Sequence, residues 1–164
     1  MLFQRVNRTD AEKVFVVVYN ASGGAFTAGQ CMVWDCGTSA DGIRVTTPAT
    51  ATLSSFAGLA SAGIANGAYG LAQVYGYTAS ASVINDITTA LAAGVIFLPV
   101  NGSANLSCAG SGGIAAADGK TGFMFAMQTN TTATAGAIAA AATKVFIRAL
   151  TLTALAFLPV TQIL

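Results

Sequence analysis

The chain has 164 residues, of which only 8% are charged whereas 54% are hydrophobic. Its formal net charge of +1 provides no electrostatic attraction to nucleic acid or to anionic lipid, so neither is expected as a partner. An average soluble domain carries about 25% charged residues. The surface of this chain must therefore consist largely of uncharged side chains and backbone, which is typical of a subunit that packs among other subunits.

The first predicted element is an N-terminal arm over residues 1–13. The arm holds a disproportionate share of the charged residues: Arg5, Arg8, Asp10, Glu12 and Lys13. It has no clear periodicity, so no strand or helix is predicted in it. It also has no apolar stretch of the kind that a secretory signal requires, which favours synthesis in a cytoplasm.

Short β-branched or apolar runs separated by turn residues follow the arm, and each run predicts a strand. The predicted strands before residue 61 are 14–20, 30–36, 43–47 and 51–60. Asp41-Gly42 predicts a turn before the third strand, and Pro48 closes that strand.

The stretch 69–77 predicts a strand without any charged residue. Alternation would place Tyr69, Leu71, Gln73, Tyr75 and Tyr77 on one face, opposite a face of glycine, alanine and valine. We expect the strand to line the domain core with one face and to meet a neighbouring subunit with the other face or with its edge.

The second half of the chain repeats the order of the first. Residues 26–35 align with 91–100, and residues 54–76 align more loosely with 106–128. These alignments predict a degenerate duplication of a small β unit. Residues 132–144 predict a loop or short helix, 144–150 a final strand, and 151–164 an apolar tail.

Many short strands, glycine-rich turns and the lack of a long amphipathic helix predict an all-β fold, a compact barrel or sandwich. We expect an arm over 1–13, one β-rich domain over 14–150 and a tail over 151–164. The domain divides into two related units at about 14–85 and 86–150. The longest apolar stretches, 87–100 and 151–164, are too short for a membrane helix, which needs about 20 residues.

Groups that could form a catalytic or metal site are scarce in this sequence. The chain has no histidine, which excludes Ser-His and Cys-His pairs, and its three cysteines, Cys31, Cys36 and Cys108, have no zinc spacing. We expect buried, reduced thiols, no cofactor, no metal and no enzyme activity. The tempting Gly119-Lys120-Thr121 lacks the earlier glycine of a phosphate-binding loop. A carboxylate pair formed by Asp35 and Asp86 is the weak remaining alternative.

Several segments of the chain stand in a characteristic order. They are "VYNASGGAFTAGQCMVWD", "GIRVTTPATATLSSFAGLA", "IANGAYGLAQVYG" and "TKVFIRAL". Over about residues 14–150 this pattern resembles the small head-decoration (cement) and related capsid-associated proteins of tailed bacteriophages. The tail from Thr151 is not part of that pattern.

The resemblance implies a β-rich virion protein, often a homotrimer, on the outside of an icosahedral capsid. Its expected partners are the major capsid protein and further copies of the chain. The residues expected to contact the capsid or another partner are Phe3, Arg5, Arg8, Tyr69, Tyr75, Tyr77 and Phe157.

Two other functions compete with capsid decoration. One is another virion component, such as a head-fibre base or a tail or baseplate piece, and copy number per particle distinguishes it. The other is a carbohydrate-binding β domain that stacks sugars on its tyrosines and Trp34.

Overall fold

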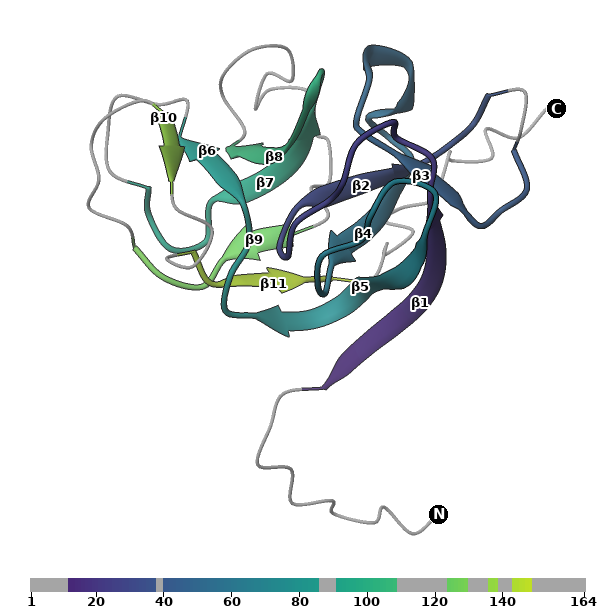
Figure 1. The fold of residues 1–164 in the computed structure, drawn as a ribbon. Helices are drawn as coiled ribbons and strands as arrows, with labels where there is room; N and C mark the ends of the chain where they lie inside the picture. Colours follow the sequence, from purple (N-terminus) through teal and green to yellow (C-terminus); the bar gives the residue numbers. More distant parts are fainter. Residues whose placement is uncertain are drawn as a thin grey trace, which may run out of the picture.

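The computed structural model describes residues 12–37, 40–85, 91–108, 124–129, 136–138 and 143–148. Within them the chain is almost entirely β, with one short 3-10 helix at Thr50–Thr52 (Figure 1). The first five strands are β1 (Lys13–Asn20), β2 (Cys31–Trp34), β3 (Arg44–Thr46), β4 (Phe56–Ala60) and β5 (Tyr69–Thr78). The other six are β6 (Val83–Asn85), β7 (Ile96–Val100), β8 (Ser103–Cys108), β9 (Met124–Ala126), β10 (Gly136–Ile138) and β11 (Val145–Ile147).

Strands β1–β5 form a closed barrel. The order is β1-β3-β2-β4-β5, and β5 pairs back onto β1 along almost the whole length of β1. The β1–β3 pair is parallel and the other pairs are antiparallel. The predicted all-β barrel is therefore confirmed, and closure leaves these strands without a free edge.

Strands β6–β11, here called the second half, lie beside the barrel (Figure 1). Four of their pairings match pairings of the barrel. The parallel pair β6–β8 corresponds to β1–β3. The antiparallel pairs β8–β7, β7–β9 and β9–β11 correspond, in that order, to β3–β2, β2–β4 and β4–β5. The role of β5 as partner of β1 is taken by β10, which pairs with β6.

The turn before β2 recurs before β7, 65 residues later. Gly29 and Gly94 both have positive φ angles, 82° and 87°. The Gly29 N–H donates to the Ala60 carbonyl and the Gly94 N–H to the Ala126 carbonyl, both at 2.8 Å. The predicted alignment of 26–35 with 91–100 thus describes equivalent backbone. Descent of both halves from one duplicated unit stays a prediction.

The looser alignment, of 54–76 with 106–128, differs from the pairings. It equates the region of β9 with β5, but β9 pairs with β7 as β4 pairs with β2. β9 therefore occupies the place of β4. The small, glycine-rich composition of both segments produced a match that the hydrogen bonds do not follow.

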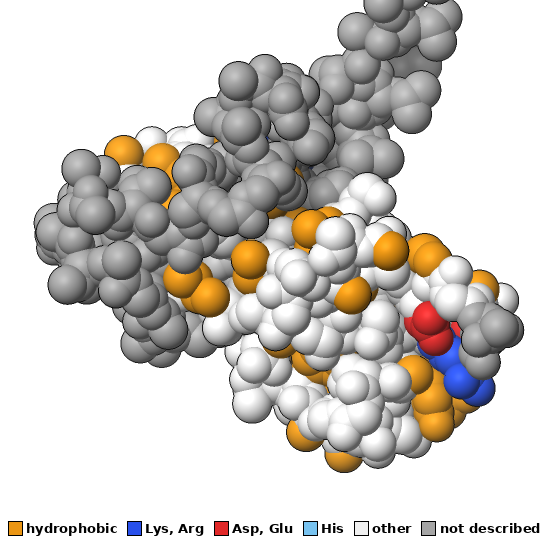
Figure 2. All heavy atoms as spheres, turned by 90° about the horizontal axis from the view of Figure 1, so that it is seen from above, with side chains coloured by type: hydrophobic (Ala, Val, Ile, Leu, Met, Phe, Trp, Pro, Cys, Tyr) orange, Lys and Arg blue, Asp and Glu red, His pale blue; other side chains and the backbone are white. Residues whose placement is uncertain are grey.

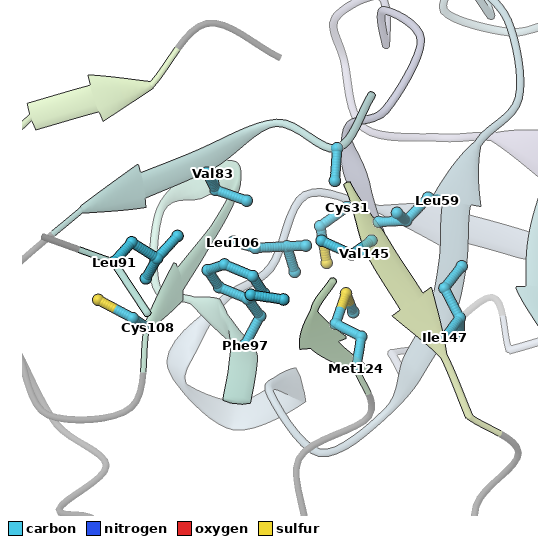
Figure 3. Packing of buried hydrophobic residues seen from close by; sticks show 12 residues of the cluster. Cys31, Leu59, Val83, Leu91, Phe97, Leu106, Cys108, Met124, Val145 and Ile147 are labelled. Carbon is cyan, nitrogen blue, oxygen red and sulfur yellow. The ribbon is translucent and has the colours of Figure 1, made fainter. Parts of the chain in front are cut away.

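Two hydrophobic clusters fill the molecule. The cluster inside the barrel consists of Val18, Phe26, Met32, Val45, Ala57, Ala60, Ile64 and Ala72. The larger cluster centres on Phe97 and Leu106 of the second half (Figure 3). It also includes Cys31 and Leu59 from β2 and β4. Because side chains of the barrel contribute to the core of the second half, the two parts are packed as one body.

Four local predictions need correction. Residues 132–144 are predicted to form a loop or short helix, but they contain the short strand β10, which pairs with β6. Residues 51–60 are not one strand, since the 3-10 helix comes first and β4 begins only at Phe56. The arm does not extend to residue 13, because Lys13 already pairs with Gly76 in the barrel. Of the three cysteines, which are all free thiols, Cys36 is exposed whereas the other two are buried.

Candidate functional site

The residues predicted to contact a partner divide into two groups. Phe3, Arg5, Arg8 and Phe157 lie outside the described residues. The three tyrosines Tyr69, Tyr75 and Tyr77 all lie on β5. They do not form the single face that simple alternation predicts.

A β-bulge separates the tyrosines. Val14 pairs with Tyr75 and Phe15 with Gln73, so Val74 is an extra residue on β5. Before the bulge Tyr69 is 66% exposed, whereas beyond it Tyr75 and Tyr77 are only partly exposed. The Tyr75 ring packs edge-on against Phe146 of β11, with ring centroids 5.4 Å apart. Tyr75 therefore helps to join the barrel to the second half.

The exposed tyrosine belongs to a strip of apolar side chains on the outer face of β1 and β5. Val17 pairs with Leu71 and Tyr19 with Tyr69, and these two pairs are neighbours along both strands. Val17 is 60% and Leu71 45% exposed, and Phe15 extends the row toward the start of β1. We call Phe15, Val17, Tyr19, Tyr69 and Leu71 the β1–β5 strip.

The Tyr19 end of the strip is held in place by a chain of contacts. The Tyr69 and Tyr19 rings meet edge to face at 5.2 Å between centroids, and the Arg44 guanidinium lies 5.5 Å from the Tyr19 centroid. Arg44 Nε donates to Asp41 Oδ2 at 3.0 Å. The two tyrosine rings are thus ordered before any partner binds, which lowers the entropy cost of binding.

Asp41 fixes the turn that carries Arg44. Its Oδ1 accepts from the Ile43 N–H at 3.0 Å and from the Arg44 N–H at 2.9 Å. The hydrogen bond from the Ile43 N–H is the largest cause that holds the pKa of Asp41 below its ordinary value of 3.8, and the bonds from Arg44 lower it further. The carboxylate therefore stays ionised at any pH near neutrality.

The residues of β1 that belong to the strip have different counterparts in the second half. Sixty-five residues after Phe15, Val17 and Tyr19 stand Ser80, Ser82 and Ile84. Ser82 is half-buried and its hydroxyl hydrogen-bonds to Asn105 Oδ1. Ser80 and Ser82 precede β6, which begins only at Val83, so the structure has no strand at the positions that match Phe15 and Val17. Sequence analysis missed Phe15 and Val17 as surface residues.

A hollow of about 250 Å³ lies beside the strip, where the start of β1, the end of β4 and β5 meet. Gln73 lies in its wall and donates from Nε2 to the Tyr75 and Tyr77 carbonyls at 3.2 and 3.1 Å. Lys13 is the one charged residue of the lining, which otherwise offers the Phe15 ring, the Gln73 amide, and hydroxyl, methyl and backbone groups. Such a lining suits water or a small neutral group and supplies no acid–base pair.

The rest of the described surface offers little chemistry. On the face in Figure 2 most described atoms are uncharged, and the acidic and basic side chains in view lie together at one corner. No three His, Cys, Asp or Glu residues among those described are grouped to hold a metal. Burial raises the pKa of the Cys31 thiol, so it stays protonated.

No helix in the described part of the chain is long and apolar enough to cross a membrane. The predicted apolar stretch 87–100 instead ends in the strand β7, Ile96–Val100. Comparison with known proteins adds no assignment: no protein-family model matches the chain, and a search of curated proteins finds no match.

Proposed function

We propose that this chain is a structural protein of a bacteriophage particle that decorates the outside of an icosahedral capsid. It would stabilise the shell by bridging major capsid subunits. The resemblance of its sequence pattern to head-decoration proteins gives the class of particle. The observation that carries a structural role is the surface itself, which is poor in charge and exposes large apolar side chains.

These exposed side chains lie mostly on the barrel: Val14, Phe15, Val17, Ile43, Tyr69, Leu71 and Met127. All but Met127 belong to its strands or to the turn before β3. A protein that stayed free in solution would gain solubility from charges at these positions. A subunit that is covered by neighbours in an assembly has no such need, and apolar contact stabilises its attachment.

Attachment would combine many weak contacts. On a symmetric shell each copy is held near its neighbours, so contacts that are individually weak give stable coverage. In this proposal Phe3, Arg5 and Arg8 of the arm contact the capsid. Ordering of the arm costs conformational entropy, and that cost is offset when several contacts form together.

Quantitative mass spectrometry of virus particles purified from the source of this chain tests the proposal. About one copy for each major capsid subunit is the expected result, and it matches coverage of the lattice. A few copies per particle would move the chain to a vertex, fibre or tail. Absence from the particles would contradict a virion role, and the carbohydrate-binding alternative would then come first.

Deleting residues 1–11, which precede the first described residue, tests the role of the arm. The truncated chain should keep its circular dichroism spectrum and melting temperature, because β1 begins only at Lys13. Its binding to particles that lack the protein should weaken at least tenfold, measured by co-sedimentation. Full binding by the truncated chain would remove the arm from the capsid contact.

A further inference from the structure

We infer that the β1–β5 strip is the surface through which two copies of this chain pack face to face, about a two-fold axis. The inference goes beyond capsid attachment, since association of the purified chain can be measured without any virus particle. It rests on three properties of the strip: its area, its symmetry and the charges at its two ends.

The area of the strip fits a weak, concentration-dependent dimer. The exposed fractions of Phe15, Val17, Tyr69 and Leu71 together equal about two fully exposed large side chains. That is roughly 350 Å² for each copy, or roughly 700 Å² of apolar surface in a pair. Stable interfaces bury about 1,200 Å² or more, of which somewhat over half is apolar. With a polar rim, the strip therefore reaches the lower end of this range.

The order of residue sizes along the strip suits a two-fold axis. Its centre is the Val17–Leu71 pair, with Phe15 on one side and the Tyr19–Tyr69 pair on the other. When a second copy lies across it with its strands antiparallel, Phe15 of each copy faces the tyrosine pair of the other. The smaller Val17 and Leu71 then meet at the axis. Aromatic side chains at both ends are the residues that contribute most to interfaces.

Each end of the strip carries charges of both signs. Lys13 is exposed at the start of β1, next to Phe15 and to the exposed Glu12, whereas Asp41 and Arg44 pair with each other at the far end beside Tyr19. The antiparallel arrangement brings the Glu12–Lys13 end of each copy toward the Asp41–Arg44 pair of the other, where each charge can face one of opposite sign. A parallel arrangement would instead place Lys13 against Lys13 and Glu12 against Glu12, which is unfavourable.

Analytical ultracentrifugation of the full chain tests this inference. The 16.4 kDa chain should double in mean mass as its concentration rises, with a dissociation constant on the order of 10–100 μM. Val17→Lys should weaken association at least tenfold, because a lysine would have to be buried at the axis. Its melting temperature should change little, since the Val17 side chain is exposed in the single chain.

Met127→Lys is the matched control. Met127 is also a large apolar residue, 47% exposed, but it lies just after β9 in the second half. This variant should associate like the unchanged chain. A second control uses Val17→Asp, which alone should also be monomeric, while an equal mixture with Val17→Lys should recover the dimer.

Three results would overturn the inference. They are a chain that stays monomeric well above 100 μM, a Val17→Lys variant that associates as strongly as the unchanged chain, and a mass of three copies. If Val17→Lys abolished binding to virus particles while the unchanged chain stayed monomeric, the strip would be a capsid contact. The virion role would then stand and the dimer would not.

Discussion

The barrel and the second half share four strand pairings but differ in how the fifth is made and in what their described residues expose. On the barrel, the outer face of β1 carries Phe15, Val17 and Tyr19, whereas serine or isoleucine occupies the matching positions of the second half. Inside, both halves place large apolar residues at the same points, such as Met32 and Phe97, which are both fully buried. Folding thus constrains the interior of both halves alike. Among the described residues, the large exposed apolar side chains lie on the barrel, with the exception of Met127.

The largest effect is expected from truncating the cores at matching positions. Phe97→Ala should lower the free energy of unfolding by about 3–5 kcal/mol and Met32→Ala by about 2–5 kcal/mol. Because Cys31 and Leu59 extend the second cluster into the barrel, both variants should unfold in one transition. Chemical denaturation followed by tryptophan fluorescence and circular dichroism measures this. Two separate transitions, each shifted by only one of the variants, would show that the halves fold independently.

The two turn glycines give a sharper comparison. A Cβ at Gly29 would lie 2.2 Å from the Ser80 carbonyl oxygen, whereas one at Gly94 would meet no described atom within 4 Å. Gly29→Ala should therefore cost about 3 kcal/mol from the clash and the strained backbone together. Gly94→Ala, with the backbone strain alone, should cost about 1 kcal/mol. Equal losses in thermal unfolding would contradict the close approach of Ser80 to Gly29.

Asn20 is expected to give an intermediate effect. Its buried Nδ2 donates to the Gly24 and Ile64 carbonyls at 2.8 and 3.0 Å, and its Oδ1 accepts from the Ser22 N–H. Asn20→Ala should cost about 2 kcal/mol, because these groups lose their partners. Asn20→Asp, which keeps the acceptor and loses both donors, should not restore stability. If Asn20→Ala left the free energy of unfolding in denaturant unchanged, these hydrogen bonds would not stabilise the fold.

The smallest change in stability is expected from a substitution in the turn before β3, which resembles the turn before β8. Asp41-Gly42 and Asn101-Gly102 are similar, with both glycines at positive φ. Asp41→Asn converts the first turn into the sequence of the second and should lower the melting temperature only slightly, since the carboxylate is exposed.

The lowered pKa of Asp41 also predicts how the difference in melting temperature between the unchanged chain and Asp41→Asn depends on pH. Because the folded-state pKa of Asp41 is depressed, its contribution to stability is present above the ordinary value of 3.8. It is lost as the pH falls through the folded-state pKa. Melting temperatures of the unchanged chain and of Asp41→Asn should therefore differ at pH 5–7 and converge in stronger acid. A difference that grew in acid would contradict the hydrogen bonds to this carboxylate.

Much of the fold could be predicted because its signals are local. Runs such as 14–20 and turns such as Asp41-Gly42 are determined by neighbouring residues, and the structure has strands and turns there. The equivalence of 26–35 and 91–100 was visible because an apolar residue precedes a glycine by three positions in both. Closure of the barrel by β1 and β5 depends on contacts about 55 residues apart, which no local pattern reports.

The candidate surface was harder to predict. Alternation assigned Tyr69, Tyr75 and Tyr77 to one face, but the extra residue Val74 interrupts the alternation. Phe15 and Val17 belong to a β-branched run that is typical of a buried strand. The sequence contains no sign that one side of that run is exposed.

Hydroxyl-radical footprinting with mass spectrometry tests the central claim most directly, because tyrosine and methionine are both oxidised readily. The chain would be compared when dilute, when concentrated and when bound to virus particles. Tyr69 should be oxidised in dilute solution and protected in the concentrated chain, whereas Met127 should remain equally reactive in both. Protection of Tyr69 only on particles would keep the strip as a docking surface with the capsid as its partner. Tyr69 that stayed fully reactive in every assembled state would contradict the account.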